Sequence, residues 1–450
     1  MSAACKEGQA AMAARLLKRL AAASPRENLV FSPLSIHAAL ALAAAGARGR
    51  TLHELLAVLG APSLDALAEF VGHAMGHTLA DRSASGAPCV AFACGAWCDA
   101  SQPLRPAYRD AVVGTYRATA ATVDFRNNPG DACKAINAWV AELTRNLITT
   151  VVHPHPGLRD TAVVLANAIY FKGQWWEPFD PEDTRDRKFR LLGGGSVRVP
   201  FMRTWSHQYI ACHDGFKVLK LHYKMKDGDN SYGFDDESDT DSDSDESDAS
   251  KRPCKRQKKR NSASPGSDDI GSSTEKELQR FCMCVFLPDA RDGLPALVDR
   301  MASDEGFVLR HLPKVYVPVG KFRLPRFNLS FDGSVHSVLR ELGLRRPFDP
   351  RKADLSGMVE DDDGGRDRRP VFVRDVCHRA ILEVDEEGSE AAAHTIFLLT
   401  DETSSGVSSS KPRKRVDFVA DHPFAFFLIE ETSGAVVFAG QVMDPSAEDF

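Results

Sequence analysis

The stretch Glu386-Glu387-Gly388-Ser389-Glu390-Ala391-Ala392-Ala393-His394-Thr395 begins with two acids and a glycine, passes through three alanines, and leads into the apolar run Ile396-Phe397-Leu398-Leu399. This composition suits an exposed loop poorly, but it suits a β-strand that pairs with neighbouring strands. The stretch therefore has two possible locations, on the surface or within a sheet. The fold must accommodate both.

Alternate residues of this stretch would point to opposite faces if it became a strand, because side chains of a strand alternate with period two. One face would carry only small or apolar side chains, namely Ser389, Ala391, Ala393, Thr395, Phe397 and Leu399. The other face would carry Glu390, Ala392, His394, Ile396 and Thr400. The first set is suited to burial between two existing strands.

The pattern Glu-Glu-Gly-Ser-Glu-Ala-Ala-Ala resembles the hinge of serpins, a family of protease inhibitors with an exposed reactive-centre loop. The resemblance implies that this loop spans residues 386–415. Its hinge would consist of Glu387, Gly388, Ser389, Glu390, Ala391, Ala392 and Ala393. The sequence departs from the inhibitory pattern at His394, on the face that would stay exposed, so we expect insertion of the loop to remain possible.

Further motifs extend the resemblance over nearly the whole chain, apart from one insert. In Asn28-Leu29-Val30-Phe31-Ser32-Pro33-Leu34-Ser35-Ile36, a short strand runs into a helix with Pro33 in its first turn, where the missing N–H costs little. The resemblance implies that Ser32, Ser35, Asn167 and His378 form the "shutter" beneath the central sheet, and that Trp175 lies in the "breach" at its top. The run Phe418-Val419-Ala420-Asp421-His422-Pro423-Phe424 is most similar to the plant branch of the family.

The fold implied by the resemblance is an α+β serpin fold in a single domain of residues 1–450, with three β-sheets and about nine helices. Residues 6–23 and 50–77 have helical patterns, and residues 163–175 are too apolar for a half-exposed strand and indicate a central one. The run Gly193-Gly194-Gly195-Ser196 is flanked by strands and lacks the following GK[ST], so we expect a hairpin turn there rather than a phosphate loop.

Between Tyr223 and Phe281 an acidic run, Asp235 to Glu246, is followed by a basic run, Lys251 to Arg260. A segment this polar cannot bury enough surface to offset its ordering entropy, so we predict disorder over residues 227–279. The basic run resembles a nuclear localisation signal for an import receptor, carried by Lys255, Arg256, Lys258, Lys259 and Arg260. The alternative is a solvated loop that partly neutralises the acidic run.

Composition sets limits on the partners of the chain. The 450 residues are 43% hydrophobic, enough for a sizeable core, and the net charge of −6 argues against a nucleic-acid-coating protein. Four basic residues interrupt the alanine-rich N-terminus, and no apolar run approaches the ~20 residues of a membrane span. The ten cysteines lack paired CxxC spacing. We therefore expect a monomeric intracellular protein, cytoplasmic, nuclear or both, with reduced cysteines and no membrane or nucleic-acid partner.

Sequence motifs of catalysis are missing. The chain contains no GxSxG, HExxH, P-loop or dinucleotide fingerprint. The pair His153-Pro154-His155 is the most metal-like, but the proline indicates a loop and no cysteine or carboxylate partner is evident nearby. Ser32, Ser35, Asn167 and His378 could be imagined as a nucleophile and base, but the resemblance implies a latch of buried hydrogen bonds instead. We expect no catalytic residues, no metal and no cofactor, hence no enzyme.

The function implied by the resemblance is inhibition of an endopeptidase by suicide-substrate trapping. The protease would form a covalent acyl complex with the loop, which would then pivot about Gly388 into the central sheet. Counting from Gly388 as in the family places the reactive bond at Glu402-Thr403, and a shift by one places it at Asp401-Glu402. This bait favours a serine or cysteine protease directed to Asp or Glu. The alternative is a non-inhibitory serpin that acts as a binding or nuclear interaction protein through the insert.

Overall fold

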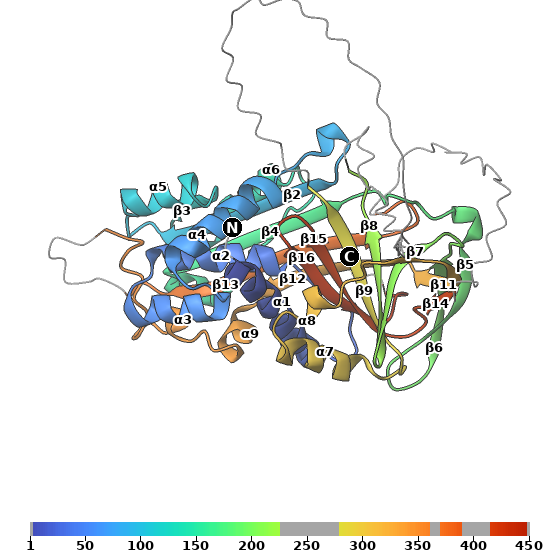
Figure 1. The fold of residues 1–450 in the computed structure, drawn as a ribbon. Coiled ribbons are helices and arrows are strands. Elements are labelled where there is room, and N and C mark those ends of the chain that lie inside the picture. Colours follow the sequence, from blue (N-terminus) through green and yellow to red (C-terminus); the bar gives the residue numbers. More distant parts are fainter. Residues whose placement is uncertain (1–2, 226–278, 361–369, 389–414, 448–450) are drawn as a thin grey trace, which may run out of the picture. The chain divides into compact units, whose positions relative to one another are not determined.

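The structure, a computed structural model, describes residues 3–225, 279–360, 370–388 and 415–447, which belong to one compact unit. Within these residues the chain forms nine α-helices and three β-sheets (Figure 1), as the sequence predicted. The insert predicted over residues 227–279 lies outside the described residues except for Gln279. That residue is buried and donates from Nε2 to the carbonyl oxygen of Ala80 at 3.1 Å, so it belongs to the folded body.

The N-terminal helices are α1 (Ala3–Ala23), α2 (Pro33–Gly46), α3 (Gly49–Leu59) and α4 (Leu64–His73), the last continued by one π-helical turn, Ala74–Thr78. Every residue of α2 except Ala45 is buried, as expected for a helix that is apolar on all sides. The single helical pattern over 50–77 is interrupted because Gly60 adopts φ +64°, the left-handed conformation that ends α3.

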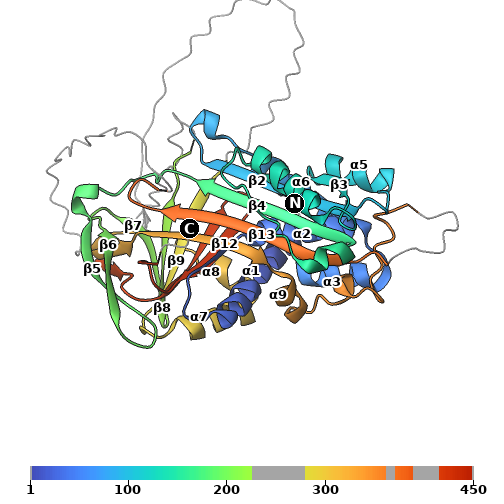
Figure 2. The ribbon, with the colours of Figure 1, turned by 180° about the vertical axis from the view of Figure 1, so that it is seen from behind.

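The five-stranded sheet is the centre of the fold (Figure 2). Its spatial order is β12 (Phe327–Ser334), β13 (Val373–Val384), β4 (Val163–Lys172), β2 (Cys89–Asp99) and β3 (Thr119–Val123). Nine of the ten residues of β4 are buried, in agreement with the prediction of a central strand. Strands β4 and β13 are parallel neighbours, and their arrows in Figure 2 point the same way.

The other two sheets are mainly antiparallel. The seven-stranded sheet has the order β1 (Leu29–Phe31), β16 (Ala435–Val442), β15 (Phe424–Glu430), β9 (Phe281–Pro288), β8 (Phe216–His222), β7 (Gln208–His213) and β10 (Tyr316–Val317). The four-stranded sheet has the order β14 (Val416–Val419), β11 (Val319–Pro325), β6 (Ser196–Met202) and β5 (Arg185–Arg190). Gly193, Gly194 and Gly195 all have positive φ in the turn between β5 and β6, so the predicted hairpin is present.

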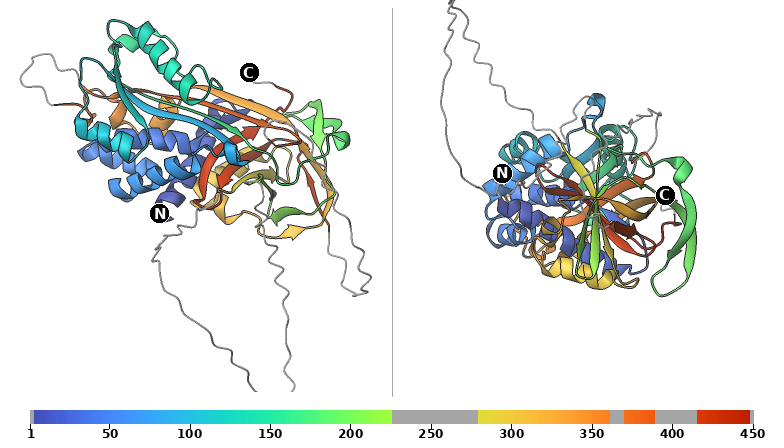
Figure 3. Two further views of the ribbon diagram at one scale, coloured as in Figure 1. Left: turned by 90° about the horizontal axis from the view of Figure 1, so that it is seen from above. Right: turned by 45° about the vertical axis from the view of Figure 1, so that its right-hand side comes forward.

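Helix α6 (Pro129–Leu143) lies on the opposite face of the five-stranded sheet from the N-terminal helices (Figure 3). Its Ile136 and Val140 pack with Ala166 and Tyr170 of β4 in a second apolar cluster, separate from the main core. The remaining helices are α5 (Pro106–Gly114), α7 (Leu294–Ser303), α8 (Phe307–Arg310) and α9 (His336–Glu341). The five-stranded sheet is therefore covered on both faces.

All nine cysteines in the described ranges are free thiols, and seven of them are buried. In the same ranges, no single helix is long and apolar enough to cross a membrane. Among the described helices, one bent pair, Gly49–Leu59 with Leu64–Thr78, is together long and apolar enough, by length and composition alone.

Candidate functional site

Four of the residues selected from the sequence form a fully buried hydrogen-bond cluster. Two of them belong to β4 and β13, and the other two lie at the start of α2. The backbone N–H of Ser32 donates to His378 Nε2 at 2.9 Å, and Ser35 Oγ donates to Asn167 Oδ1 at 2.6 Å. Because Nε2 accepts a bond, the ring proton of His378 is on Nδ1, which lies 2.5 Å from the same Asn167 oxygen. We call Ser32, Ser35, Asn167 and His378 the shutter cluster.

The shutter cluster joins separate elements of the fold. Asn167 belongs to β4, and its Nδ2 donates to the carbonyl oxygen of Cys377 on β13 at 3.1 Å. Ser32 precedes α2, accepts a hydrogen bond from Ser35 N at its start, and donates from Oγ to Val437 O on β16 at 2.6 Å. One set of buried polar groups thus connects the two parallel strands to the helix and sheet below them.

Burial lowers the pKa of His378 to about 3, because the surrounding protein penalises the charged imidazolium. The unfolded chain should instead bind a proton on this histidine below pH 6.5, the ordinary value. Stability is therefore full above pH 6.5 and declines as the pH falls from 6.5 towards 3. The shutter cluster makes the fold sensitive to acid.

We predict that His378→Gln weakens the acid dependence of stability. The wild type should lose up to about 1.4 kcal/mol per pH unit below 6.5 through this one group. The variant should be less stable at pH 7.5, because a neighbour loses its hydrogen bond, but its stability should fall less between pH 6.5 and 5. Urea denaturation at several pH values measures both effects.

The matched control is His53→Gln, since His53 is exposed in α3 and lies outside the shutter cluster. His37 must be left in place, because burial also lowers its pKa, to about 4. Equal acid dependence in the wild type and His378→Gln would contradict a neutral buried histidine in the shutter cluster.

A second group of contacts lies where β4 ends and the chain leaves β13. Trp175 is buried, and its ring stacks on Tyr223 with centroids 4.4 Å apart. Its indole Nε1 donates to the carbonyl oxygen of Asp385 at 2.8 Å, and its backbone N–H donates to Glu387 O at 2.7 Å. Trp175 therefore fixes the first hinge residue, Glu387, and Asp385 just before it.

Residues Asp385 to Gly388 form a tight turn. The Asp385 carboxylate accepts from the backbone N–H groups of Glu387 and Gly388 at 2.9 and 3.1 Å. Burial nevertheless raises the pKa of Asp385. Gly388 has φ +139°, and a Cβ at that position would lie 2.1 Å from the carbonyl oxygen of Gly173, so only glycine fits. The start of the hinge is thus closely packed against the end of β4.

Glu386 is held between this turn and the neighbouring sheet. Its carboxylate is buried and pairs with the guanidinium of Arg326, whose Nε lies 2.6 Å from Oε1. The hydroxyl of Thr184 donates to the same oxygen. Arg326 lies between β11 and β12 and Thr184 directly precedes β5, so three distant segments meet at one carboxylate.

We predict that Arg326→Ala destabilises the intact protein more than Glu386→Gln. The first change leaves a carboxylate buried without its cationic partner, which costs ~3–5 kcal/mol for a fully buried pair. The cost should be smaller here, because the Arg326 side chain is 42% exposed. The second change leaves an amide oxygen that still accepts from Thr184 and Arg326. Thermal unfolding of the intact protein ranks the variants, and the reverse order would contradict this role.

The hinge begins at the common end of β4 and β13. Gly388 forms an antiparallel bridge with Gln174, two residues beyond β4, while β13 ends at Val384. Along their length β4 and β13 pair directly, with His378 opposite Asn167. The segment that follows Gly388 therefore starts at the open end of the boundary between two parallel strands.

The loop after α6 is also tied to the five-stranded sheet. Asn137 Oδ1 accepts from the backbone N–H groups of Val151 and Val152 at 2.9 and 3.0 Å. His153 Nε2 lies 3.0 Å from Asp332 Oδ2 on β12, and Arg379 of β13 lies 2.9 Å from the same oxygen. His153, which looked metal-like in the sequence, thus has a carboxylate partner that the sequence did not reveal. No group of three or more His, Cys, Asp or Glu in the described part of the chain could hold a metal ion.

Other predicted site residues lie outside the described residues. They comprise the hinge positions Ser389, Glu390, Ala391, Ala392 and Ala393, the reactive-bond residues Asp401, Glu402 and Thr403, and the basic residues Lys255, Arg256, Lys258, Lys259 and Arg260. Conversely, sequence reasoning did not assign roles to Arg326, Asp332 and Asp385. Their ion pairs and turn contacts join positions far apart in the chain, and only the acidic start of the hinge hinted at Glu386.

Residues 7–232 and 277–445 match the family model described as serpin (serine protease inhibitor). The chain is a serpin. Members of this family are typically protease inhibitors that change conformation, and the predicted hinge and shutter residues lie within the matched ranges.

Relatives of this serpin occur in cereals. It is 47% identical to serpin-Z2A of Oryza sativa subsp. japonica over 447 residues, covering 98% of this chain and 97% of that one. It is 35% identical to serpin-Z1C of Triticum aestivum, covering 94% and 91%. Among solved structures, AtSerpin1 of Arabidopsis in its native stressed conformation has a TM-score of 0.78 and 32% identity, covering 99% of this chain and 100% of that one. The similarity to plant serpins predicted from the sequence is confirmed.

Proposed function

We propose that this serpin inhibits an endopeptidase by suicide-substrate trapping, in which the cleaved reactive-centre loop enters the sheet between β4 and β13. The observation that supports this most strongly is the position of Gly388. It lies at the common end of the two strands, bridged to Gln174, so the chain that follows it needs only to fold back along the boundary.

The direction of the strands favours such an insertion. After the reversal at Asp385–Gly388, a segment running back would be antiparallel to both β13 and β4. One parallel pair would be replaced by two antiparallel pairs, which are slightly more stable per residue. Each added hydrogen bond contributes ~0.5–1.5 kcal/mol, so about a dozen inserted residues would provide a large driving force.

Contacts across the boundary between β4 and β13 oppose the same step. Asn167 of β4 bonds both His378 and Cys377 of β13, and a new strand would separate them. Trp175, Glu386 and Asp385 hold the start of the hinge, while the loop after α6 ties β12 and β13 from above through Asp332. The intact form would therefore be kept by a kinetic barrier.

The hinge residues test the proposal directly. Ser389→Arg or Ala391→Glu would place a charge on the face that must be buried on insertion, where an unpaired charge is expensive. Each variant should still be cleaved but should become mainly a substrate, with a severalfold higher stoichiometry of inhibition. The measurement is titration of a protease that the wild type inhibits, with a gel assay for the covalent complex.

The matched control is Ala392→Glu, which places the same charge on the opposite face of the inserting strand. It should retain a stoichiometry close to that of the wild type. Cleavage of the wild-type loop should also raise the melting temperature by at least about 10 °C, if a dozen residues add a strand. A cleaved wild type with unchanged thermal stability and no covalent complex would favour the non-inhibitory alternative.

We further propose that the target cleaves after an acidic residue, at Asp401-Glu402 or Glu402-Thr403. A trypsin-like pocket, which carries a carboxylate, would repel these side chains. The basic run Lys411-Pro412-Arg413-Lys414-Arg415 could also attract a trypsin-like enzyme. Cleavage so far from the hinge would leave a long loop segment between the hinge and the acyl-enzyme. The protease would then not be distorted, and the serpin should be turned over as a substrate.

Mass spectrometry of the peptide released from a trapped complex identifies the reactive bond. A glutamyl endopeptidase and a caspase-type protease are the first enzymes to incubate with the serpin. The expected new N-terminus is Glu402 or Thr403. Any other N-terminus in the trapped complex would overturn the assignment of an acidic bait while leaving the trapping mechanism intact.

A further inference from the structure

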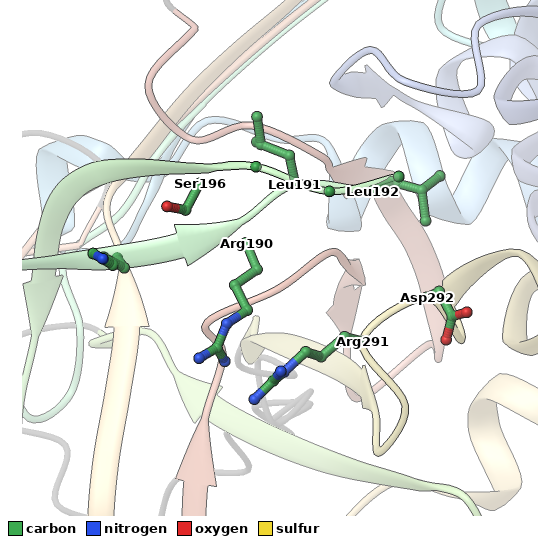
Figure 4. A pocket seen from close by; sticks show the side chains of 10 residues that line it. Arg190, Leu191, Leu192, Ser196, Arg291 and Asp292 are labelled. Atoms are coloured by element: carbon green, nitrogen blue, oxygen red, sulfur yellow. The ribbon is translucent and has the colours of Figure 1, made fainter.

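A half-open pocket of about 520 Å³ lies between the β5–β6 hairpin and the loop that joins β9 to α7 (Figure 4). Its lining residues come from these two segments: Lys188, Arg190, Leu191, Leu192, Gly193, Gly194, Gly195, Ser196, Arg291 and Asp292. This volume is within the range of small-molecule sites. The pocket is separate from the shutter cluster and from the hinge, so the proposed inhibitory mechanism does not account for it.

The β5–β6 hairpin that forms one wall of the pocket carries two like charges opposite each other. Lys188 of β5 is directly opposite Arg198 of β6, and both side chains are exposed. Like charges in directly opposite positions destabilise a strand pair. Within the described ranges neither residue forms an ion pair, although Asp186 lies two positions before Lys188 on the same face.

The opposite wall adds a further cation, Arg291. Figure 4 shows the side chains of Arg190 and Arg291 extending towards the same space, whereas the Asp292 carboxylate points elsewhere. Arg26, from the connection between α1 and β1, adds a further charge at the rim, since its Nη2 lies 3.7 Å from the Cβ position of Gly193. Cations from three segments of the chain therefore surround one concave surface.

Part of the pocket is rigidly built. Arg190 Nη1 lies 3.2 Å from Asp421 Oδ2, and Asp421 Oδ1 lies 3.0 Å from Nδ1 of the buried His422. His422 Nε2 lies 2.8 Å from the carbonyl oxygen of Pro288, which immediately precedes the loop that carries Arg291. The hydrogen bond from His422 and the charges of Arg190 and Arg291 lower the pKa of Asp421. This chain of contacts connects the two walls and holds Arg190 in place.

We propose that this pocket binds a compact ligand that carries two or more phosphate groups close together. The forked guanidinium groups of Arg190 and Arg291 match phosphate oxygens, and Lys188 adds a further cation. A Cβ at Gly194 or Gly195 would meet no atom within 4 Å, so the turn leaves the rim open. The bound phosphates would relieve the repulsion between Lys188 and Arg198.

Protection of an exposed sheet edge is the simpler explanation for charges on β5, because Lys and Arg prevent edge-to-edge pairing. It accounts for Lys188 and for Arg187, which points to the other face of β5. It does not account for Arg291, which belongs to another segment, or for the ion pair of Arg190 with Asp421, whose carboxylate is held by the buried His422. The convergence of these groups distinguishes a ligand pocket from a protected edge.

Isothermal titration of the full-length serpin with tripolyphosphate and with inositol hexakisphosphate tests the proposal. The wild type should bind at least one of them saturably with a stoichiometry of one. Tighter binding of tripolyphosphate would indicate a linear polyphosphate ligand, and tighter binding of inositol hexakisphosphate a cyclic one. The double variant Lys188→Ser, Arg291→Ser should bind about tenfold or more weakly, because it loses two charge-assisted contacts. Both residues are exposed, and an unchanged melting temperature without ligand verifies the fold.

The matched control is Arg187→Ser, which removes a charge from the same strand outside the pocket and should change the affinity less than about twofold. Equal weakening in the control and the double variant would indicate a diffuse surface charge and overturn the pocket. The absence of saturable binding to both probes would overturn it as well. So would tighter binding of an Asp- and Glu-rich peptide than of either phosphorylated probe.

Discussion

The hydrogen bonds of the Asn167 carboxamide hold β4 and β13 together at the centre of the fold. Its oxygen accepts from Ser35 and lies within hydrogen-bond distance of His378, and its nitrogen donates to the backbone of Cys377. All of these groups are buried, so each bond that is broken without replacement leaves a desolvated polar group at a cost of ~1–3 kcal/mol. The sheet opening that we propose would need a set of contacts of this kind, strong when complete and weak once one partner moves. Apolar packing is non-directional, so packing alone would let the two strands separate by small steps without defining one closed arrangement.

Three further sets of contacts hold the same sheet at other places. Trp175 and Glu386 hold the end of the sheet where the hinge starts, and the ion pairs of Asp332 hold the loop after α6 above it. Each uses a different kind of interaction: stacking with backbone hydrogen bonds, a buried carboxylate with a cation, and a partly exposed ion pair. The Asp332 ion pairs lie apart from the other two and should contribute nearly additively, whereas Trp175 and Glu386 hold the same turn and should be coupled. In the proposed mechanism, cleavage of the loop would remove none of them, so the driving force would have to come from the new strand.

Much of the fold could be inferred from the sequence, because its signals are local. The apolar run from Val163, the Ser32-Pro33 helix start and the glycine turn at 193–195 each carry their own information, and the structure contains all three. The break at Gly60 was missed, because an isolated glycine within a helical pattern is compatible with either outcome. The four shutter residues were grouped by family resemblance, whereas the partners Arg326 and Asp332 are long-range contacts that no local pattern encodes. The pocket beside β5 likewise depends on Arg291, about a hundred positions away from Lys188 in the chain.

The parallel pairing of β4 with β13 has a consequence for how the chain reaches this state. The contact between Asn167 and Cys377 joins positions 210 residues apart, so forming it requires closure of a very long loop. A hairpin between β13 and the chain just beyond Gly388 would need almost no closure, and local contacts form earlier in folding than distant ones. If the loop can insert as we propose, the non-local pair has to form before this local competitor becomes stable. The order of folding events would then matter as much as the depth of the final energy minimum.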